Sequence, residues 1–88
     1  MEVFFSKHAR EQMLRRRINE EIVLMVVFQP DQIIYSNENP TMKIYQSIIK
    51  ENDVMFLVRI FIDIDKQPNV IVTVYKTTKI SKYYESEI

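Results

Sequence analysis

FSKHAREQMLRRRINEEIVLMVVFQPD, residues 5–31, predicts two consecutive helices. Ser6 suits the N-cap of a helix over about Lys7–Arg17, because its hydroxyl can accept a hydrogen bond from a free amide of the first turn. Asn19 predicts a second N-cap, and the two glutamates after it stand where the helix dipole favours negative charge. The apolar run that follows is rich in β-branched residues, yet the cap, the acidic turn and the stop at Pro30 favour a buried helix over a strand.

The remainder of the chain predicts a sheet. Segments rich in Ile, Val, Tyr and Phe alternate with clusters of Asn, Asp and Pro, as strands separated by turns do. The four expected strands are Gln32–Ser36, Met42–Lys50, Val54–Ile62 and Val70–Thr77. We therefore expect a single α+β domain over residues 1–88, with two N-terminal helices packed on one face of a four-stranded, mainly antiparallel sheet.

Three smaller features complete this expectation. Val3–Phe5 is a short strand candidate, and the charged tail over residues 79–88 is expected to form a last helical turn or to fray. In the last strand, period-2 alternation places one set of side chains on one face and a second set on the other. These sets are Val70, Val72 and Val74, and Thr73, Tyr75 and Thr77.

Composition excludes several classes of function. The 88 residues include no cysteine, which rules out disulfides and thiolate metal sites, and no glycine, which rules out the glycine loops that hold nucleotide cofactors. No histidine or carboxylate cluster has metal-ligand spacing, so we expect neither a metal nor a cofactor. The start of the chain does not read as a signal peptide, and the longest apolar run, Ile22–Phe28, is too short to span a membrane. We therefore expect a cytoplasmic protein.

The first helix carries the candidate catalytic residues. His8, Gln12 and Arg16 are spaced by four and should form one ridge. Arg16 is expected at the edge of the buried stripe, where its guanidinium can hold a phosphate bidentately, or else can pair with a carboxylate. His8 is the only histidine, and it can serve as a general acid or base, or simply hydrogen-bond the first turn.

The sheet supplies a second group of candidates, made of tyrosine, threonine and basic residues. Tyrosine can stack on an unpaired base while lysine and arginine meet the backbone, which is how single-stranded nucleic acid is commonly held. The alternative is that these are good strand residues that face solvent. The group consists of Tyr45, Arg59, Thr73, Tyr75 and Thr77, continued by Lys76, Lys79, Tyr83 and Tyr84.

Two separated motifs resemble a known family. Ser6–Met13, SKHAREQM, with the later RRI, EE and PD, resembles the opening "HAxERMxxRGI…EE…NPD" of small bacterial domains of unknown function. The strand Val70–Thr77, VIVTVYKT, is similar to the closing "VVTVYRT" of the same family. Those domains are placed near the RelE/ParE/BrnT-like toxins.

This resemblance implies a RelE-like fold and a metal-independent RNA endonuclease that is paired with an antitoxin in a type II toxin–antitoxin module. The family's patterned polar positions correspond to His8, Glu11, Arg16, Tyr75 and Thr77. The chain departs from the pattern at two positions. Gln12 replaces the usual arginine, which predicts weaker phosphate binding. Arg17 replaces the usual glycine, so the turn between the helices is not expected to rely on glycine's left-handed conformation.

Two functions follow from these observations. In the first, the catalytic residues of an RNA endonuclease are His8 as acid or base, Arg16 as a phosphate clamp and Tyr75 as a stacking or orienting group. Its RNA-binding residues are Arg59, which is also expected to clamp phosphate, and Thr77, Lys76, Lys79 and Tyr45. In the second, the same fold is a non-catalytic RNA-binding or protein-interaction domain. The net charge of zero favours the second, as does the apolar run Ile22–Phe28, which could contact an antitoxin or a second copy in a homodimer.

Overall fold

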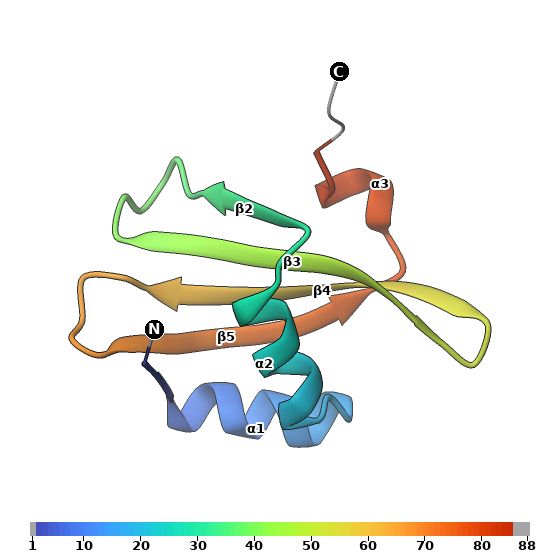
Figure 1. Cartoon of the computed structure of the whole chain (residues 1–88), viewed down its shortest axis with the longest axis horizontal. Helices are drawn as coiled ribbons and strands as arrows, with labels where there is room; N and C mark the ends of the chain where they lie inside the picture. Colours follow the sequence, from blue (N-terminus) through green and yellow to red (C-terminus); the bar gives the residue numbers. More distant parts are fainter. Residues whose placement is uncertain (1, 86–88) are drawn as a thin grey trace.

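One mixed sheet of five strands forms the centre of the molecule in the computed structural model, which describes residues 2–85 (Figure 1). The strand order is β1-β5-β4-β3-β2. The elements are β1 (Val3–Phe5), α1 (Lys7–Arg16), α2 (Glu20–Phe28), β2 (Gln32–Tyr35), β3 (Met42–Glu51), β4 (Val54–Asp63), β5 (Asn69–Thr77) and α3 (Ile80–Tyr83). No helix within residues 2–85 is long and apolar enough to cross a membrane.

The expected α+β class and two N-terminal helices are confirmed, but the expected four-stranded sheet is wrong. Val3–Phe5 is a fifth strand, and it pairs in parallel with β5, so the sheet is mixed. The other neighbouring strands pair antiparallel. Three residues are too few for an alternation signal, and the partner of β1 lies more than sixty residues away in sequence, with Val3 opposite Asn69. Only the assembled sheet reveals this pairing.

Both predicted N-caps are confirmed. The Ser6 hydroxyl oxygen accepts a hydrogen bond from the amide of Ala9 at 3.0 Å, and the Asn19 side chain accepts one from the amide of Ile22 at 2.8 Å. Between the two helices, Arg17 ends α1 in the left-handed conformation, with φ 55° and ψ 48°. The expectation that the turn avoids this conformation is therefore wrong: the turn uses it although the side chain opposes it.

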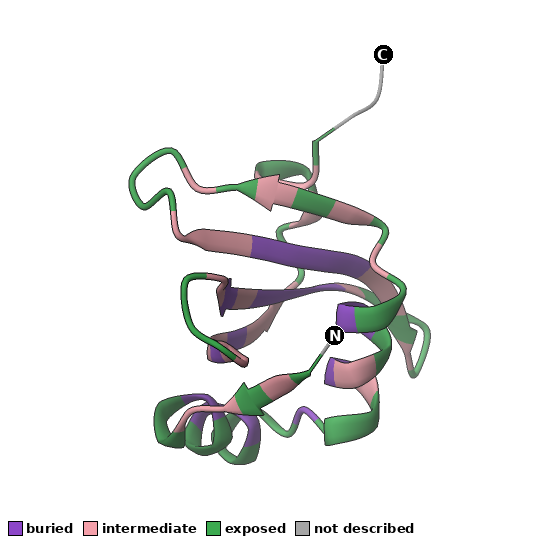
Figure 2. Ribbon diagram, turned by 60° about the vertical axis from the view of Figure 1, so that its left-hand side comes forward, coloured by how far each residue is buried: buried purple, intermediate pink, exposed green. Residues whose placement is uncertain are grey.

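The main core lies between α1, α2 and one face of the sheet. In Figure 2, buried strand residues, coloured purple, lie under the two helices, whose exposed parts are coloured green. Tyr45 is part of this core and is only 8% exposed, so the prediction that it binds RNA on the polar face does not fit its position. The reason is register: Tyr45 is opposite Ile60 on the helix side, and its neighbour Gln46 faces the other way. The core consists of Ala9, Met13, Ile18, Val23, Val26, Val27, Tyr45, Val58, Ile60, Ile62, Ile71 and Val74.

The alternation expected for the last strand is wrong before Val72, because β5 contains a bulge there. Phe61 of β4 is opposite Thr73, but the next residue, Ile62, is opposite Ile71. Val72 is thus an extra residue in the pairing, and the side chains before it are shifted to the other face. Ile71 therefore joins Val74 under the helices.

Helix α1 covers the outer edge of β5 beyond the end of β1. The Ser6 amide donates to the carbonyl of Ile71 at 2.9 Å, and the Ser6 hydroxyl donates to that of Val72 at 3.4 Å. Further along α1, the Gln12 side chain accepts from the Val74 amide at 2.9 Å, and one turn after Gln12 the Arg16 Nη1 donates to the Val74 carbonyl at 3.2 Å. The polar ridge of α1 therefore satisfies peptide groups that a neighbouring strand would otherwise bind.

The left-handed Arg17 gives a first prediction. Arg17→Gly should raise the free energy of unfolding by about 0.5–1 kcal/mol, because glycine adopts positive φ without the steric cost that a side chain carries. Urea denaturation checks this. Arg15→Gly, two residues earlier in right-handed helix, is the matched control and should lower stability by about 1 kcal/mol. Equal losses for both variants would contradict the assignment of strain to Arg17.

Candidate functional site

A row of four polar side chains crosses the sheet on the face opposite α1 and α2. Gln32, Gln46, Arg59 and Tyr75 are directly opposite one another in the register of β2, β3, β4 and β5. Gln46 Nε2 donates to Gln32 Oε1 at 2.8 Å, Arg59 Nε donates to Gln46 Oε1 at 2.9 Å, and Arg59 Nη1 donates to the Tyr75 hydroxyl at 2.6 Å. We call these four residues the polar row. Because each member bonds the next, the orientation of Tyr75 depends on the whole row.

Arg59 is the buried charge of this row. It is 7% exposed, and among the ion pairs found within residues 2–85 none involves it. Its guanidinium carbon instead lies 4.4 Å from the ring centre of Tyr83, 5.3 Å from that of Phe61 and 5.6 Å from that of Tyr75. The negative faces of aromatic rings attract such a cation. Arg59 was expected to clamp phosphate, but a side chain enclosed in this way orients its neighbours rather than meeting a ligand.

The short helix α3 is attached to the polar row. Gln46 Nε2 also donates to the backbone carbonyl of Tyr83 at 3.2 Å, and the Glu85 amide donates to Gln32 Oε1 at 3.1 Å. The rings of Tyr75 and Tyr83 meet edge to face, with their centres 6.2 Å apart. The C-terminal segment was expected to form a helical turn or to fray, and within the described residues it forms the turn. It does so because the polar row fixes it to the sheet.

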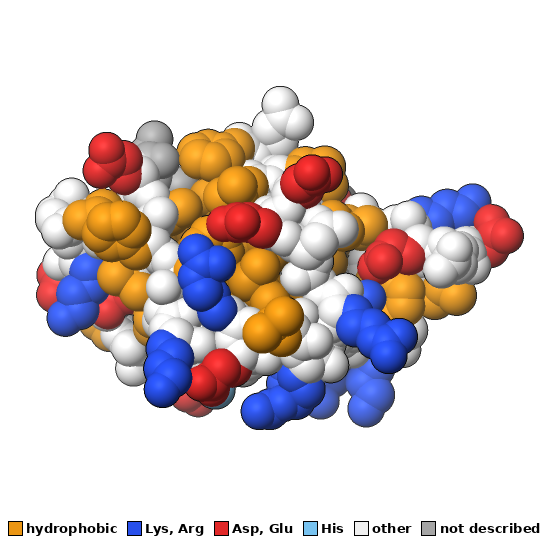
Figure 3. Space-filling model, turned by 90° about the horizontal axis from the view of Figure 1, so that it is seen from below, with side chains coloured by type: hydrophobic (Ala, Val, Ile, Leu, Met, Phe, Trp, Pro, Cys, Tyr) orange, Lys and Arg blue, Asp and Glu red, His pale blue; other side chains and the backbone are white. Residues whose placement is uncertain are grey.

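A cleft of about 610 Å³ opens beside Tyr75 and Tyr83, where the end of α1 meets the end of β5. Figure 3 shows the molecule from the α1 side, where lysine and arginine side chains gather toward the end of α1 with apolar groups between them. The cleft is lined by Arg16, Phe56, Tyr75, Lys76, Thr77, Thr78, Lys79 and Tyr83. It thus contains five of the residues that the sequence proposed for a site: Arg16, Tyr75, Lys76, Thr77 and Lys79.

The cations of the cleft differ in how they are held. Arg16 is fixed by its bond to the Val74 carbonyl, and its guanidinium carbon lies 5.6 Å from the ring centre of Tyr75. Lys76 is paired with Glu51, at 3.1 Å between Nζ and Oε1, and also lies over the Phe56 ring. Lys79 is exposed. Among the described residues neither Arg16 nor Lys79 is paired with an acidic side chain, so these two cations keep their full charge for an anion in the cleft, whereas the charge of Lys76 is partly neutralised.

The surroundings of Tyr83 make its phenol more acidic than usual. The pKa of its phenol is lowered from the ordinary value of 10.0, chiefly because Lys82 hydrogen-bonds to it. The charges of Lys82 and Arg59 and a hydrogen bond with Tyr75 act in the same direction, while desolvation opposes them. A tyrosine whose pKa is lowered in a cleft gives up its proton more readily than usual, which is the property a general base needs.

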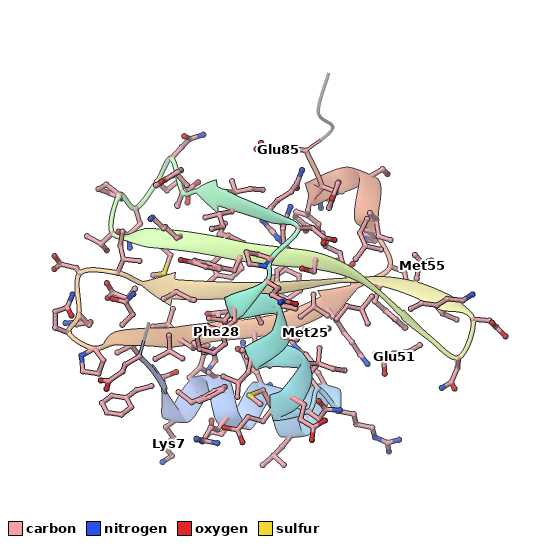
Figure 4. All side chains as sticks on the ribbon, viewed as in Figure 1. Lys7, Met25, Phe28, Glu51, Met55 and Glu85 are labelled. Atoms are coloured by element: carbon pink, nitrogen blue, oxygen red, sulfur yellow. The ribbon has the colours of Figure 1, made fainter. Side chains whose placement is uncertain are left out.

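His8 lies outside the cleft. It is exposed in the first turn of α1, whereas Arg16 ends that helix, so the two are about 12 Å apart along its axis at about 1.5 Å per residue. In Figure 4, Lys7, the neighbour of His8, lies far from Glu51, the partner of the cleft residue Lys76. The middle residue of the predicted ridge, Gln12, is buried and bonded to Val74. The structure thus brings Arg16 and Tyr75 together but leaves His8 apart.

Sequence reasoning did not choose Gln46 or Phe56 as site residues, and it placed Tyr83 among the candidates of the sheet face without giving it a catalytic or binding role. The sequence did contain a signal for Gln46: it is a polar residue with isoleucines two positions away on each side along a predicted strand. In the structure it shares a face with the residue opposite, Arg59. Tyr83 lies after a turn, and no local sequence pattern predicts in which direction the chain leaves that turn. Within residues 2–85 no group of three or more histidine, cysteine or acidic side chains could hold a metal ion.

A small α+β domain with a basic, tyrosine-lined cleft along one edge of its sheet is thus the class that fold and site define. The family described as a domain of unknown function, DUF4258, matches residues 5–76, and the chain belongs to it. The matched range includes Arg16 and Tyr75 and ends before α3. Comparison with curated proteins and with solved structures found no significant match.

The polar row gives a second prediction. Arg59→Met keeps the bulk of the side chain but leaves the Gln46 oxygen and the Tyr75 hydroxyl without their donor, so it should lower the free energy of unfolding by about 1–3 kcal/mol. Urea denaturation measures this, with Arg15→Met on the exposed side of α1 as a control expected within about 0.5 kcal/mol of the parent. Adding Tyr75→Phe to Arg59→Met should cost less than Tyr75→Phe alone, since the two share one bond. Strict additivity would contradict the coupling.

The lowered pKa of Tyr83 gives a third prediction. Ultraviolet titration should detect one tyrosine that ionises below the ordinary range, and this step should vanish in Tyr83→Phe. Lys82→Met should raise the pKa of Tyr83, because it removes the largest cause of the shift. A depressed folded-state pKa means that ionised Tyr83 stabilises the fold as pH rises through that pKa, and that this contribution disappears below it. An unchanged titration in Lys82→Met would refute the stated cause.

Proposed function

We propose that this protein is a metal-independent RNA endonuclease whose active site is the cleft between α1, β5 and α3. The observation that carries the proposal is the meeting of Arg16 and Lys79, two cations without an acidic partner among the described residues, with two phenols, one of which has a lowered pKa. Cations favour a phosphodiester, and tyrosine rings favour unpaired bases. The volume of about 610 Å³ is large enough for a nucleotide-sized group.

The proposed chemistry uses groups of the chain and solvent water. In such a reaction the ribose 2′-hydroxyl loses its proton to a base and attacks the adjacent phosphorus, and the bond to the 5′-oxygen breaks as that oxygen takes a proton from water. Tyr83, whose lowered pKa favours the phenolate over an ordinary tyrosine, is suited to take the first proton. Arg16 is suited to stabilise the charge that develops on the phosphate oxygens, because its bond to Val74 holds it in place beforehand. Tyr75, oriented by Arg59, is suited to stack on the base.

In this proposal the base is Tyr83 and not His8, which the sequence had suggested. The reason is geometry: a base must reach the atom that it deprotonates, and His8 is one helix length away from the cations of the cleft. Arg59 becomes a positioning residue, because it acts through Tyr75 and Tyr83.

The resemblance to RelE-like toxins supports a biological role for such cleavage. In that role the domain is the toxin of a type II toxin–antitoxin module, and a cognate antitoxin neutralises it. Expression of the chain without an antitoxin should then arrest growth. A non-catalytic RNA-binding domain is the second candidate, and the net charge of zero together with the Lys76–Glu51 pair favours it.

The fourth prediction separates these candidates. Purified protein incubated with single-stranded RNA in EDTA should cleave it, and Tyr83→Phe and Arg16→Ala should each lower kcat/KM by about 100-fold or more. Arg15→Ala, in the same turn but away from the cleft, is the matched control, and both it and His8→Ala should retain activity. The rate should rise with pH up to the pKa of Tyr83 and then level off.

Other outcomes have clear meanings. RNA binding without cleavage, lost in Arg16→Ala, would establish the second candidate. Cleavage that depends on His8 and not on Tyr83 would restore the histidine as the acid or base. Neither binding nor cleavage would overturn both functions.

A further inference from the structure

The two edges of the sheet differ in whether other parts of the chain cover them. The β5 edge is covered by β1 and then by side chains of Ser6, Gln12 and Arg16. The opposite edge is β2, and within residues 2–85 no element pairs with its outer side. An uncovered edge strand exposes a row of amide and carbonyl groups that can bind another strand.

Register identifies which peptide groups point outward from β2. The Ser36 amide donates to the carbonyl of Met42, the residue opposite it, at 3.2 Å. In an antiparallel pair every second residue exchanges such bonds, so Ile34 and Gln32 also point their peptide groups toward β3. The peptide groups of Ile33 and Tyr35 therefore point away from the sheet.

The same alternation is found independently at the far side of the sheet. The alternation that starts at Ser36 can be followed from strand to strand through the register of β3 and β4. It predicts that the peptide groups of Val72, Val74 and Lys76 point outward from β5. Val72 and Val74 are the residues whose peptide groups bond to Ser6, Gln12 and Arg16 of the covering segment. The assignment of outward groups on β2 is therefore consistent across four strands.

The side chains of this edge are also suited to a partner. Ile33 is 44% exposed and Tyr35 is 65% exposed, although both are large and apolar. Natural edge strands commonly carry a charge or a proline that discourages pairing. β2, with the sequence QIIY, carries neither.

We propose that β2 pairs with β2 of a second copy of the chain, about a two-fold axis at Ile34, to form one continuous sheet. In this antiparallel arrangement Ile33 of each copy is opposite Tyr35 of the other. Both residues have outward peptide groups, so each pair can exchange both hydrogen bonds. The facing side chains are an aromatic and a β-branched residue, a favourable cross-strand combination.

A second copy fits this edge better than a different partner does. The edge is complementary to itself in hydrogen-bond alternation and in apolar character, and a two-fold interface requires self-complementarity of this kind. β2 itself carries no charge, and Lys43 of β3 lies with its Nζ 5.0 Å from the ring centre of Tyr35. The cleft lies at the other edge of the sheet, so the dimer would leave both clefts open. The proposal does not depend on the proposed function.

Sedimentation equilibrium of the full chain over a range of concentrations tests the proposal. The mass should rise with concentration from 10.7 kDa toward twice that value. Hydrogen exchange followed by NMR should show that the amides of Ile33 and Tyr35 become protected as the dimer forms, whereas the amide of Ile34 is protected at every concentration. A mass that stays at 10.7 kDa up to millimolar protein would overturn the proposal.

Proline substitution tests the edge itself. Ile33→Pro removes an amide that β3 does not use, so the monomer fold should persist while half of the intermolecular hydrogen bonds are lost. The dimer should weaken by about tenfold or more. Dimerisation that is unaffected in a folded Ile33→Pro variant would place the interface elsewhere and refute the pairing.

A pair of double variants keeps the proposal testable if proline disturbs folding. Position 33 of one copy is opposite position 35 of the other, so Ile33→Lys with Tyr35→Lys places like charges across the interface, whereas Ile33→Lys with Tyr35→Glu places opposite charges there. The first double variant should be monomeric, and the second should associate more strongly, with the difference shrinking in high salt. Equal association of the two would exclude this register.

Discussion

The structure depends on the hydrogen bonds by which α1 covers the outer edge of β5. β1 is only three residues long, and beyond it the strand has outward amides and carbonyls that need partners. Ser6, Gln12 and Arg16 supply them at intervals that match a helix lying along the strand. This constraint fixes where α1 ends, and therefore where Arg16 stands relative to Tyr75. The cleft is a consequence of how the sheet edge is completed.

A second constraint acts from the opposite face of the sheet. Arg59 is a buried cation that is stabilised by a glutamine, a phenol and aromatic rings, within the part of the chain that the structure describes. Such a charge is costly to desolvate, so its hydrogen bonds and ring contacts must all be in place. α3 supplies the Tyr83 ring, and Gln46 bonds the backbone of α3. The burial of Arg59 and the position of Tyr83 are thus parts of one arrangement.

These two constraints meet at Tyr75. Its hydroxyl accepts from Arg59 below the surface, and its ring lies near the guanidinium of Arg16 at the edge. A phenol held from both sides has little rotational freedom. A site built on strands and a capped helix in this way is more rigid than one built on loops, which suits a function that requires several groups to converge on one phosphate.

Local chemistry explains what the sequence determined by itself: two capped helices, four strands with Val3–Phe5 as a fifth candidate, and the prediction of a polar surface whose members Arg16, Tyr75, Thr77, Lys76 and Lys79 line one cleft. Caps, periodicity and turn residues act over a few positions, so they can be recognised along the chain. Tertiary structure alone decided the parallel β1, the bulge at Val72, the burial of Tyr45 and Arg59, and the separation of His8 from the cleft. Each of these depends on which strands are neighbours and in what register, and that information lies in pairings between residues far apart in the chain.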